Sequence, residues 1–170
     1  MMNQKNVLIL TLIFLILSLF VITLLLVSGC VSESPPDAMS AQQLLRDNED
    51  SIRTVVEYLI DTGFENVHIS GASKSMLADL SDCTIDNPTV YTAVNELIDE
   101  GSYIDIKKRG NTIVFEQWNG LRDIGCGIAY SINETDFPEI LFLVELTPIS
   151  PDGWFYYLYD YNTWRNHRTD

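Results

Sequence analysis

The stretch from Val7 to Val27 carries no charged side chain, and Thr11, Ser18 and Thr23 are its only polar side chains. A run of this length matches the roughly 20 apolar residues that a helix needs to cross a hydrocarbon core. It is longer than the roughly 7–15-residue apolar region of a cleaved secretory signal. A retained transmembrane helix is therefore one interpretation of this leader, and the rest of the chain would then be tied to a membrane.

The end of the leader supports a second interpretation. The sequence Val27-Ser28-Gly29-Cys30 resembles a lipobox, the signal by which prokaryotic lipoproteins are lipidated on a cysteine and then cleaved before it. This resemblance implies that residues 1–29 are a signal peptide and that Cys30 carries the lipid. Several acyl chains, palmitate among them, would anchor the protein, because a single chain gives only marginal and reversible membrane binding.

Both interpretations predict the same orientation. Lys5 and the amino terminus are the only positive charges before the leader, and the next basic residue is Arg46. Because positive charge is retained on the cytoplasmic side, we expect residues 31–170 to face outside the cytoplasm at the cell membrane. The proline-containing segment 30–39 is then a tether, and 40–170 has a length typical of a single domain.

The charge of the chain limits its partners. Lys and Arg number 10 against 24 Asp and Glu, which gives a formal net charge of −14. Such a surface repels nucleic acid at long range and keeps an exported domain soluble. We expect no nucleic-acid partner. We also expect no cofactor or metal, since the spacing of Asp79, Asp82 and Asp86 matches no calcium-binding loop.

Three cysteines are present, and they fit export. If Cys30 takes the lipid, Cys83 and Cys126 remain as an even pair, and an oxidising compartment favours a disulfide between them. The alternative is a pair of buried free thiols, which are common in protein cores.

The hydrophobic pattern predicts an α+β domain with two main helices followed by an antiparallel sheet of about five strands. The first helix spans 40–62, with Ser40 and Gln43 as a capping box, and the second begins at Asn87-Pro88 and ends at Gly101. A short strand at 66–70 lies between them, and 71–82 is ambiguous. The sheet strands are predicted at 103–108, 112–118, 124–132, 140–146 and 154–159, with 140–146, which is apolar except at Glu145, as a central strand.

Two of these strands have uneven faces. In 124–132 large apolar residues alternate with Gly, Ala and Ser, so one face is nearly bare and would admit a helix or another backbone. In 154–159 both faces are aromatic. If one face is exposed, it forms a platform suited to a sugar ring or a protein partner, whereas the alternative is that helices cover it. The candidate binding residues are Trp118, Trp154, Tyr157 and Tyr159.

Residues 51–116 also resemble a winged helix-turn-helix domain. A first helix ends at Thr62, a short second helix is possible at 74–80, and TVYTAVNELIDEG is similar to the recognition helix of ferric-uptake-type repressors, with a hairpin wing after it. The segment 75–106 has no Lys or Arg to contact phosphate, so a membrane-tethered winged-helix module remains an alternative only.

Catalytic motifs are few. The chain has no G-x-S-x-G, H-E-x-x-H or S-x-x-K motif. A hydrolase-like enzyme would have to use Cys83 as a nucleophile with His68 as its base, or carboxylates in a cleft, and the first of these needs a free thiol. We therefore expect a non-enzymatic binding domain of a membrane-anchored surface lipoprotein, with an envelope protein or a glycan as its partner.

Overall fold

A computed structural model describes residues 35–73, 75–119, 124–133 and 136–167. The leader, the lipobox-like sequence and Cys30 lie outside the described residues. Among the helices that the structure does describe, none has the length and apolar character needed to cross a membrane. The described residues belong to one compact unit, Pro35–Asp170.

The predicted first helix is divided in two. Helix α2 spans Ala38–Asp47 and helix α3 spans Glu49–Asp61, with a non-helical backbone at Asn48 between them (φ −118°, ψ 20°). The helix begins earlier than predicted, because Asp37 is the cap: its carboxylate accepts hydrogen bonds from the backbone N–H and the hydroxyl of Ser40, at 2.8 and 2.7 Å. The capping box at Ser40 is therefore wrong, and an Asx cap replaces it.

The predicted second helix is confirmed. Helix α4 spans Pro88–Asn95 and continues as a π-helical turn, η1, over Glu96–Glu100. The side chain of Asn87 accepts hydrogen bonds from the backbone N–H groups of Thr89 and Val90, at 3.0 and 3.3 Å. A short helix α5, Tyr161–His167, follows the last strand.

The chain folds as an α+β domain, but the predicted two main helices and about five strands are wrong. The described residues form four α-helices and a single eight-stranded antiparallel sheet in the order β3-β2-β1-β4-β5-β6-β8-β7. Two of the additional strands are only three residues long, too short to show an alternating pattern. The strands are β1 Asn66–Ser70, β2 Met76–Ala78, β3 Ser81–Cys83, β4 Asp105–Arg109, β5 Thr112–Asn119, β6 Ile124–Ser131, β7 Leu143–Ser150 and β8 Trp154–Asp160.

The strand predicted at the centre of the sheet lies at its edge. Strand β7 pairs only with β8, which inserts between β6 and β7. The segment 140–146, apolar except at Glu145, misled the prediction because its first part is not in the strand. Ile140, Leu141 and Phe142 precede β7 and line a pocket instead.

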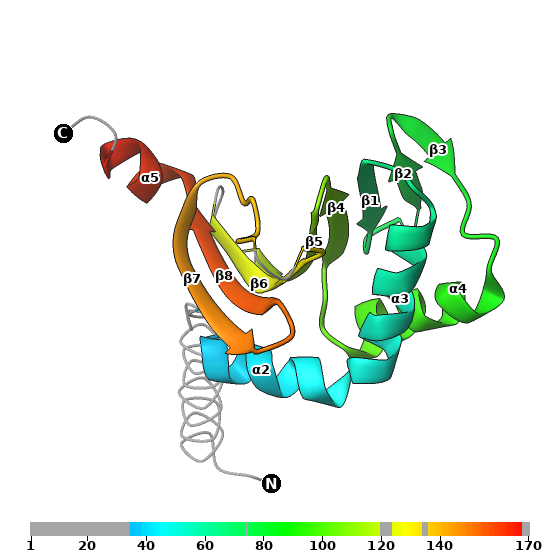
Figure 1. Cartoon of the computed structure of the whole chain (residues 1–170), viewed down its shortest axis with the longest axis horizontal. Coiled ribbons are helices and arrows are strands. Elements are labelled where there is room, and N and C mark those ends of the chain that lie inside the picture. Colours follow the sequence, from blue (N-terminus) through cyan, green and yellow to red (C-terminus); the bar gives the residue numbers. More distant parts are fainter. Residues whose placement is uncertain (1–34, 74, 120–123, 134–135, 168–170) are drawn as a thin grey trace, which may run out of the picture. The chain divides into compact units, whose positions relative to one another are not determined.

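The hydrophobic core lies between one face of the sheet and the helices. It combines the inward side chains of α2, α3 and α4 with Val67, Ile69, Ile106, Phe115 and Ile128 from the strands. Helix α2 packs under β6, β7 and β8, and α3 packs against α4 near β1 (Figure 1). The sheet curves between β4 and β6, so its two ends rise beside the face that α2, α3 and α4 leave uncovered, the helix-free face.

The helix-turn-helix interpretation is wrong. The segment expected to form its second helix contains β2, which pairs with β1 in the sheet. The predicted hairpin at Arg109-Gly110-Asn111 is confirmed, with Gly110 at a positive φ of 53°. Its strands β4 and β5 are interior strands of the sheet, however, and do not form a protruding wing.

The predicted disulfide is also wrong, because Cys83 and Cys126 are free thiols. Cys83 lies on edge strand β3, and Cys126 lies on β6 with β2, β1, β4 and β5 between them. Neighbouring strands are about 4.8 Å apart, whereas a disulfide needs Cα atoms within about 7 Å.

We expect the two thiols to react differently with iodoacetamide at pH 8 without reductant. Cys83 is half-buried and should be alkylated in the folded protein. Cys126 is fully buried, and burial raises the pKa of its thiol to about 11, so little reactive thiolate forms. It should react only after denaturation, as read by peptide mass spectrometry with Cys83→Ser as the control. Failure of both to react in denaturant would show a disulfide.

Candidate functional site

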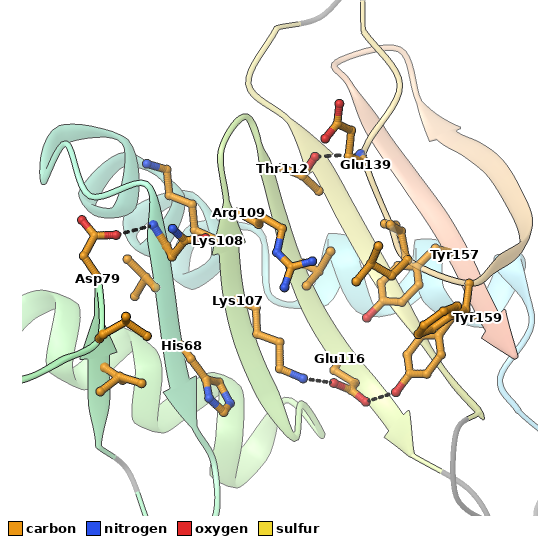
Figure 2. Close-up of a pocket in the computed structure, with 18 residues that line it drawn as sticks. His68, Asp79, Lys107, Lys108, Arg109, Thr112, Glu116, Glu139, Tyr157 and Tyr159 are labelled. Atoms are coloured by element: carbon orange, nitrogen blue, oxygen red, sulfur yellow. Dashed lines mark hydrogen bonds and ion pairs between the residues drawn. The ribbon is translucent and has the colours of Figure 1, made fainter. Parts of the chain in front are cut away.

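The helix-free face of the sheet holds a cavity of about 440 Å³. Its floor and walls come from β1, β2, β4, β5 and β8, and the segment 139–142 before β7 forms one side (Figure 2). Residues directly opposite in an antiparallel pair share a face. The register pairs Asp105 with Glu116, Glu116 with Gly127, and Gly127 with Tyr157, which places this row on the cavity side.

A buried carboxylate organises the floor of this pocket. Glu116 is only 2% exposed. The ammonium group of Lys107 donates to Glu116 Oε2 at 2.5 Å, and the hydroxyl of Tyr159 donates to Glu116 Oε1 at 2.9 Å (Figure 2). Lys107 Nζ also lies 3.4 Å from Asp105 Oδ2. Both oxygens of the buried carboxylate are thus hydrogen-bonded, as a buried charge requires.

These contacts keep Lys107 charged. Burial alone would lower the pKa of Lys107, but the hydrogen bond and charge of Glu116, together with Asp105, outweigh burial and hold this pKa above its ordinary value. Burial raises the pKa of Tyr157 well above the usual value for a phenol. At neutral pH the floor therefore contains an ion pair and a neutral tyrosine hydroxyl.

His68 points into the same pocket, but Cys83 does not. His68 pairs with Leu77, and Leu77 pairs with Asp82, so these three share the pocket face. Cys83 pairs with Met76 and packs against the core on the opposite face. The predicted nucleophile pair is therefore wrong, because the sheet separates its two members.

His68 instead approaches a carboxylate. Its Nε2 lies 3.3 Å from Asp105 Oδ2, without the directed geometry of a hydrogen bond. In the described part of the chain, no group of three or more His, Cys, Asp or Glu side chains is placed to hold a metal ion.

Backbone strain gathers at this pocket. Four non-glycine residues in the described ranges have a positive φ, and three of them, Asp79, Leu80 and Phe142, line the cavity. Leu80 is at φ 69° and its side chain is 93% exposed. The left-handed conformation costs an L-residue roughly 1–2 kcal/mol, and such strain clusters at functional sites. The turn between β2 and β3 and the segment before β7 thus have energetically unfavourable backbone conformations on either side of the cavity.

The bare face of β6 makes room for the site. A Cβ on Gly125 would lie 2.6 Å from the ring of Tyr159, and a Cβ on Gly127 would lie 2.0 Å from the carbonyl oxygen of Phe115. The close backbone at Gly127 belongs to β5, the strand paired with β6, rather than to a segment packed on the bare face. At Gly125 the missing side chain leaves room for the ring of Tyr159. In this position the hydroxyl of Tyr159 reaches Glu116.

The four candidate binding residues do not form one surface. Trp118 and Trp154 pack against the core on the helix side. Tyr157 and Tyr159 are on the pocket side, where their rings stack with centroids 6.3 Å apart. The second aromatic face of β8 is therefore not covered by helices, and it is not an open platform either, because Tyr157 is only 2% exposed.

Glu116, Lys107 and Arg109 were missed as site residues. Their signal was the period-two placement of charges in two neighbouring strands, where Asp105, Lys107 and Arg109 alternate with hydrophobic or buried positions. Sequence alone could not reveal that this charged face closes into a pocket. Comparisons of the chain with protein-family models, with curated proteins and with solved structures find no match.

Proposed function

We propose that this domain is a non-catalytic binding module that holds a small, partly apolar molecule in the pocket on the helix-free face of its sheet. The observation that carries the proposal is the convergence of a buried, fully hydrogen-bonded ion pair with apolar and strained residues around one cavity. A cavity of about 440 Å³ is within the size range of small-molecule sites, which are mostly apolar with a few fixed polar groups.

Binding fits this chemistry better than catalysis. A general base needs a free oxygen within reach of substrate, but Glu116 uses one oxygen for Lys107 and the other for Tyr159. A nucleophilic amine needs a lowered pKa, whereas the pKa of Lys107 is raised. These groups are suited to fixing the shape and charge of a pocket.

The proposed location is the outer surface of a membrane. The apolar leader from Val7 to Val27 and the lipobox-like sequence ending at Cys30 support it, together with the single early Lys5. A small molecule is a better ligand than the glycan or envelope protein considered from sequence, because the pocket is concave and Tyr157 offers no open ring face.

We expect a pocket-filling substitution to abolish binding. Val114 lines the cavity on β5, so Val114→Trp should occupy the space needed by a ligand. The matched control is Val144→Trp on edge strand β7, where the side chain is exposed and lies outside the pocket. The measurement is ligand-observed NMR with acidic, neutral and basic fragments on the full chain in lipid nanodiscs, with empty nanodiscs as the blank.

The result expected is a set of fragments that bind the wild type and Val144→Trp but bind Val114→Trp about tenfold more weakly or not at all. Circular dichroism verifies that both variants are folded. If no fragment distinguishes the wild type from the folded Val114→Trp protein, the pocket is not a ligand site.

A further inference from the structure

The cationic side chains that line the pocket differ in how available they are to bind a ligand. Lys107 is engaged by Glu116 and Asp105, at 2.5 and 3.4 Å. The ammonium group of Lys108 donates to the backbone carbonyl oxygen of Phe64, and its side chain is buried. Neither lysine has its charge free for a ligand.

Arg109 is different. It lies at the end of β4, opposite Thr112 on β5 and Asn66 on β1. Within the described parts of the chain its guanidinium forms no ion pair. Figure 2 shows this guanidinium turned into the space between Lys107 and Tyr157. A guanidinium presents a planar set of donors that matches a carboxylate in a two-point contact.

The sides of the cavity are apolar. Leu77 and Leu80 come from the β2–β3 hairpin, and Ile140, Leu141 and Phe142 come from the segment before β7. Leu80 and Leu141 are strongly exposed, at 93% and 59%. Apolar side chains that surround an unpaired cation suit a ligand with both an apolar body and a negative group.

The remaining charges favour a single negative charge over two. Glu139 and Asp79 also line the cavity, and Asp79 Oδ1 is held by the backbone N–H of Asn66 at 2.9 Å. Since Glu116 already neutralises Lys107, Arg109 is the one exposed cation of the lining. A dianionic phosphate would meet twice the repulsion from the two carboxylates that a monocarboxylate meets.

We infer that the pocket takes a monocarboxylate with an apolar body and that the carboxylate pairs with Arg109. This inference rests on the proposed function and adds to it the chemical class of the ligand. Arg109 acts as the anchor that selects the anion, and the apolar sides of the cavity bind the body of the molecule.

The test compares three probes of one shape: 4-phenylbutyrate, 4-phenylbutan-1-ol and 4-phenylbutylamine. Each is titrated calorimetrically into the full chain in lipid nanodiscs, with empty nanodiscs as the blank. We expect 4-phenylbutyrate to bind at least about tenfold more tightly than the alcohol, and the amine to bind most weakly.

Arg109→Gln should remove the preference for the acid while leaving the affinity for the alcohol unchanged. Arg109→Lys should keep part of the preference, because it keeps the charge without the two-point geometry. Arg46→Gln on α2, exposed and outside this pocket, is the matched control and should behave as the wild type.

Results that contradict the ligand class differ from results that contradict the binding site itself. Equal affinity for acid and alcohol, unchanged in Arg109→Gln, would overturn the inference about charge while leaving the pocket as a binding site. Preference for the amine would overturn it as well, by showing that Glu139 and Asp79 dominate. No binding of any probe, together with no fragment that distinguishes Val114→Trp, would overturn both proposals.

Discussion

Replacing Glu116 with alanine is expected to destabilise the domain by about 3–5 kcal/mol. The substitution leaves the half-buried ammonium group of Lys107 with only the longer contact to Asp105, and it removes the hydrogen bond between the hydroxyl of Tyr159 and Glu116. An uncompensated charge in a partly buried site costs more than the lost contact itself. Urea denaturation of the full chain, followed by tryptophan fluorescence, measures the change.

Three further variants identify the cause. Glu145→Ala removes an exposed carboxylate on β7 and should change the free energy of unfolding by less than about 0.5 kcal/mol. Glu116→Gln should cost less than alanine, since an amide still accepts a hydrogen bond from Tyr159. The double variant Lys107→Met with Glu116→Leu should recover most of the loss, because apolar residues can replace a buried ion pair. Equal costs for Glu116→Ala and Glu145→Ala would contradict the structure of the site.

Signals confined to a few neighbouring residues predicted structure well. Asn87-Pro88 predicted the start of α4, and Arg109-Gly110-Asn111 predicted the β4–β5 hairpin, because caps and tight turns depend on local backbone geometry. The strand at 66–70 was correct for a similar reason. The helix from Ser40 failed only where Asn48 interrupts a continuous apolar pattern and Asp37 provides the cap.

The order of the strands in the sheet could not be predicted from local sequence patterns. Apart from Glu145, which argues against burial on both faces, nothing in the residues of 140–146 distinguishes a central strand from a loop and edge strand that line a cavity. The insertion of β8 between β6 and β7 decides between them, and that pairing joins distant parts of the chain. The disulfide prediction failed likewise, since an even cysteine count carries no information on which strands separate Cys83 from Cys126.

The site was recognised only in part from the aromatic residues. Tyr157 and Tyr159 were correctly chosen as a pair on one face of a strand, but Trp118 and Trp154 proved to belong to the opposite face. Alternation along β8 already separates Trp154 from Tyr157 and Tyr159. For Trp118 the distinction depends on the irregularity between Glu116 and Trp118 in the β5–β6 pairing, which shifts the register, and a strand pattern of period two cannot reveal such a bulge.

Beside the same bulge, Gly127 is one of two described glycines, with Gly71, at which a Cβ would lie about 2 Å from a backbone oxygen. A Cβ on Gly127 would lie 2.0 Å from the carbonyl oxygen of Phe115, 3.0 Å from the backbone nitrogen of Gln117 and 3.1 Å from the Cα of Glu116. All three neighbours are backbone atoms of β5, so none can rotate aside. Gly127→Ala is therefore expected to separate β5 from β6 and to destabilise the domain by at least about 3 kcal/mol.

The comparison is with Gly110→Ala at the turn of the β4–β5 hairpin. A Cβ on Gly110 would have no atom within 4 Å, and the position differs only by its positive φ of 53°, so alanine there should cost about 1–2 kcal/mol. Urea denaturation measures both variants. Because Glu116 lies opposite Gly127, Gly127→Ala should also weaken binding of 4-phenylbutyrate, whereas Gly110→Ala should weaken it less. If the two variants unfold at the same urea concentration, the close approach of β5 to β6 is not what fixes the site.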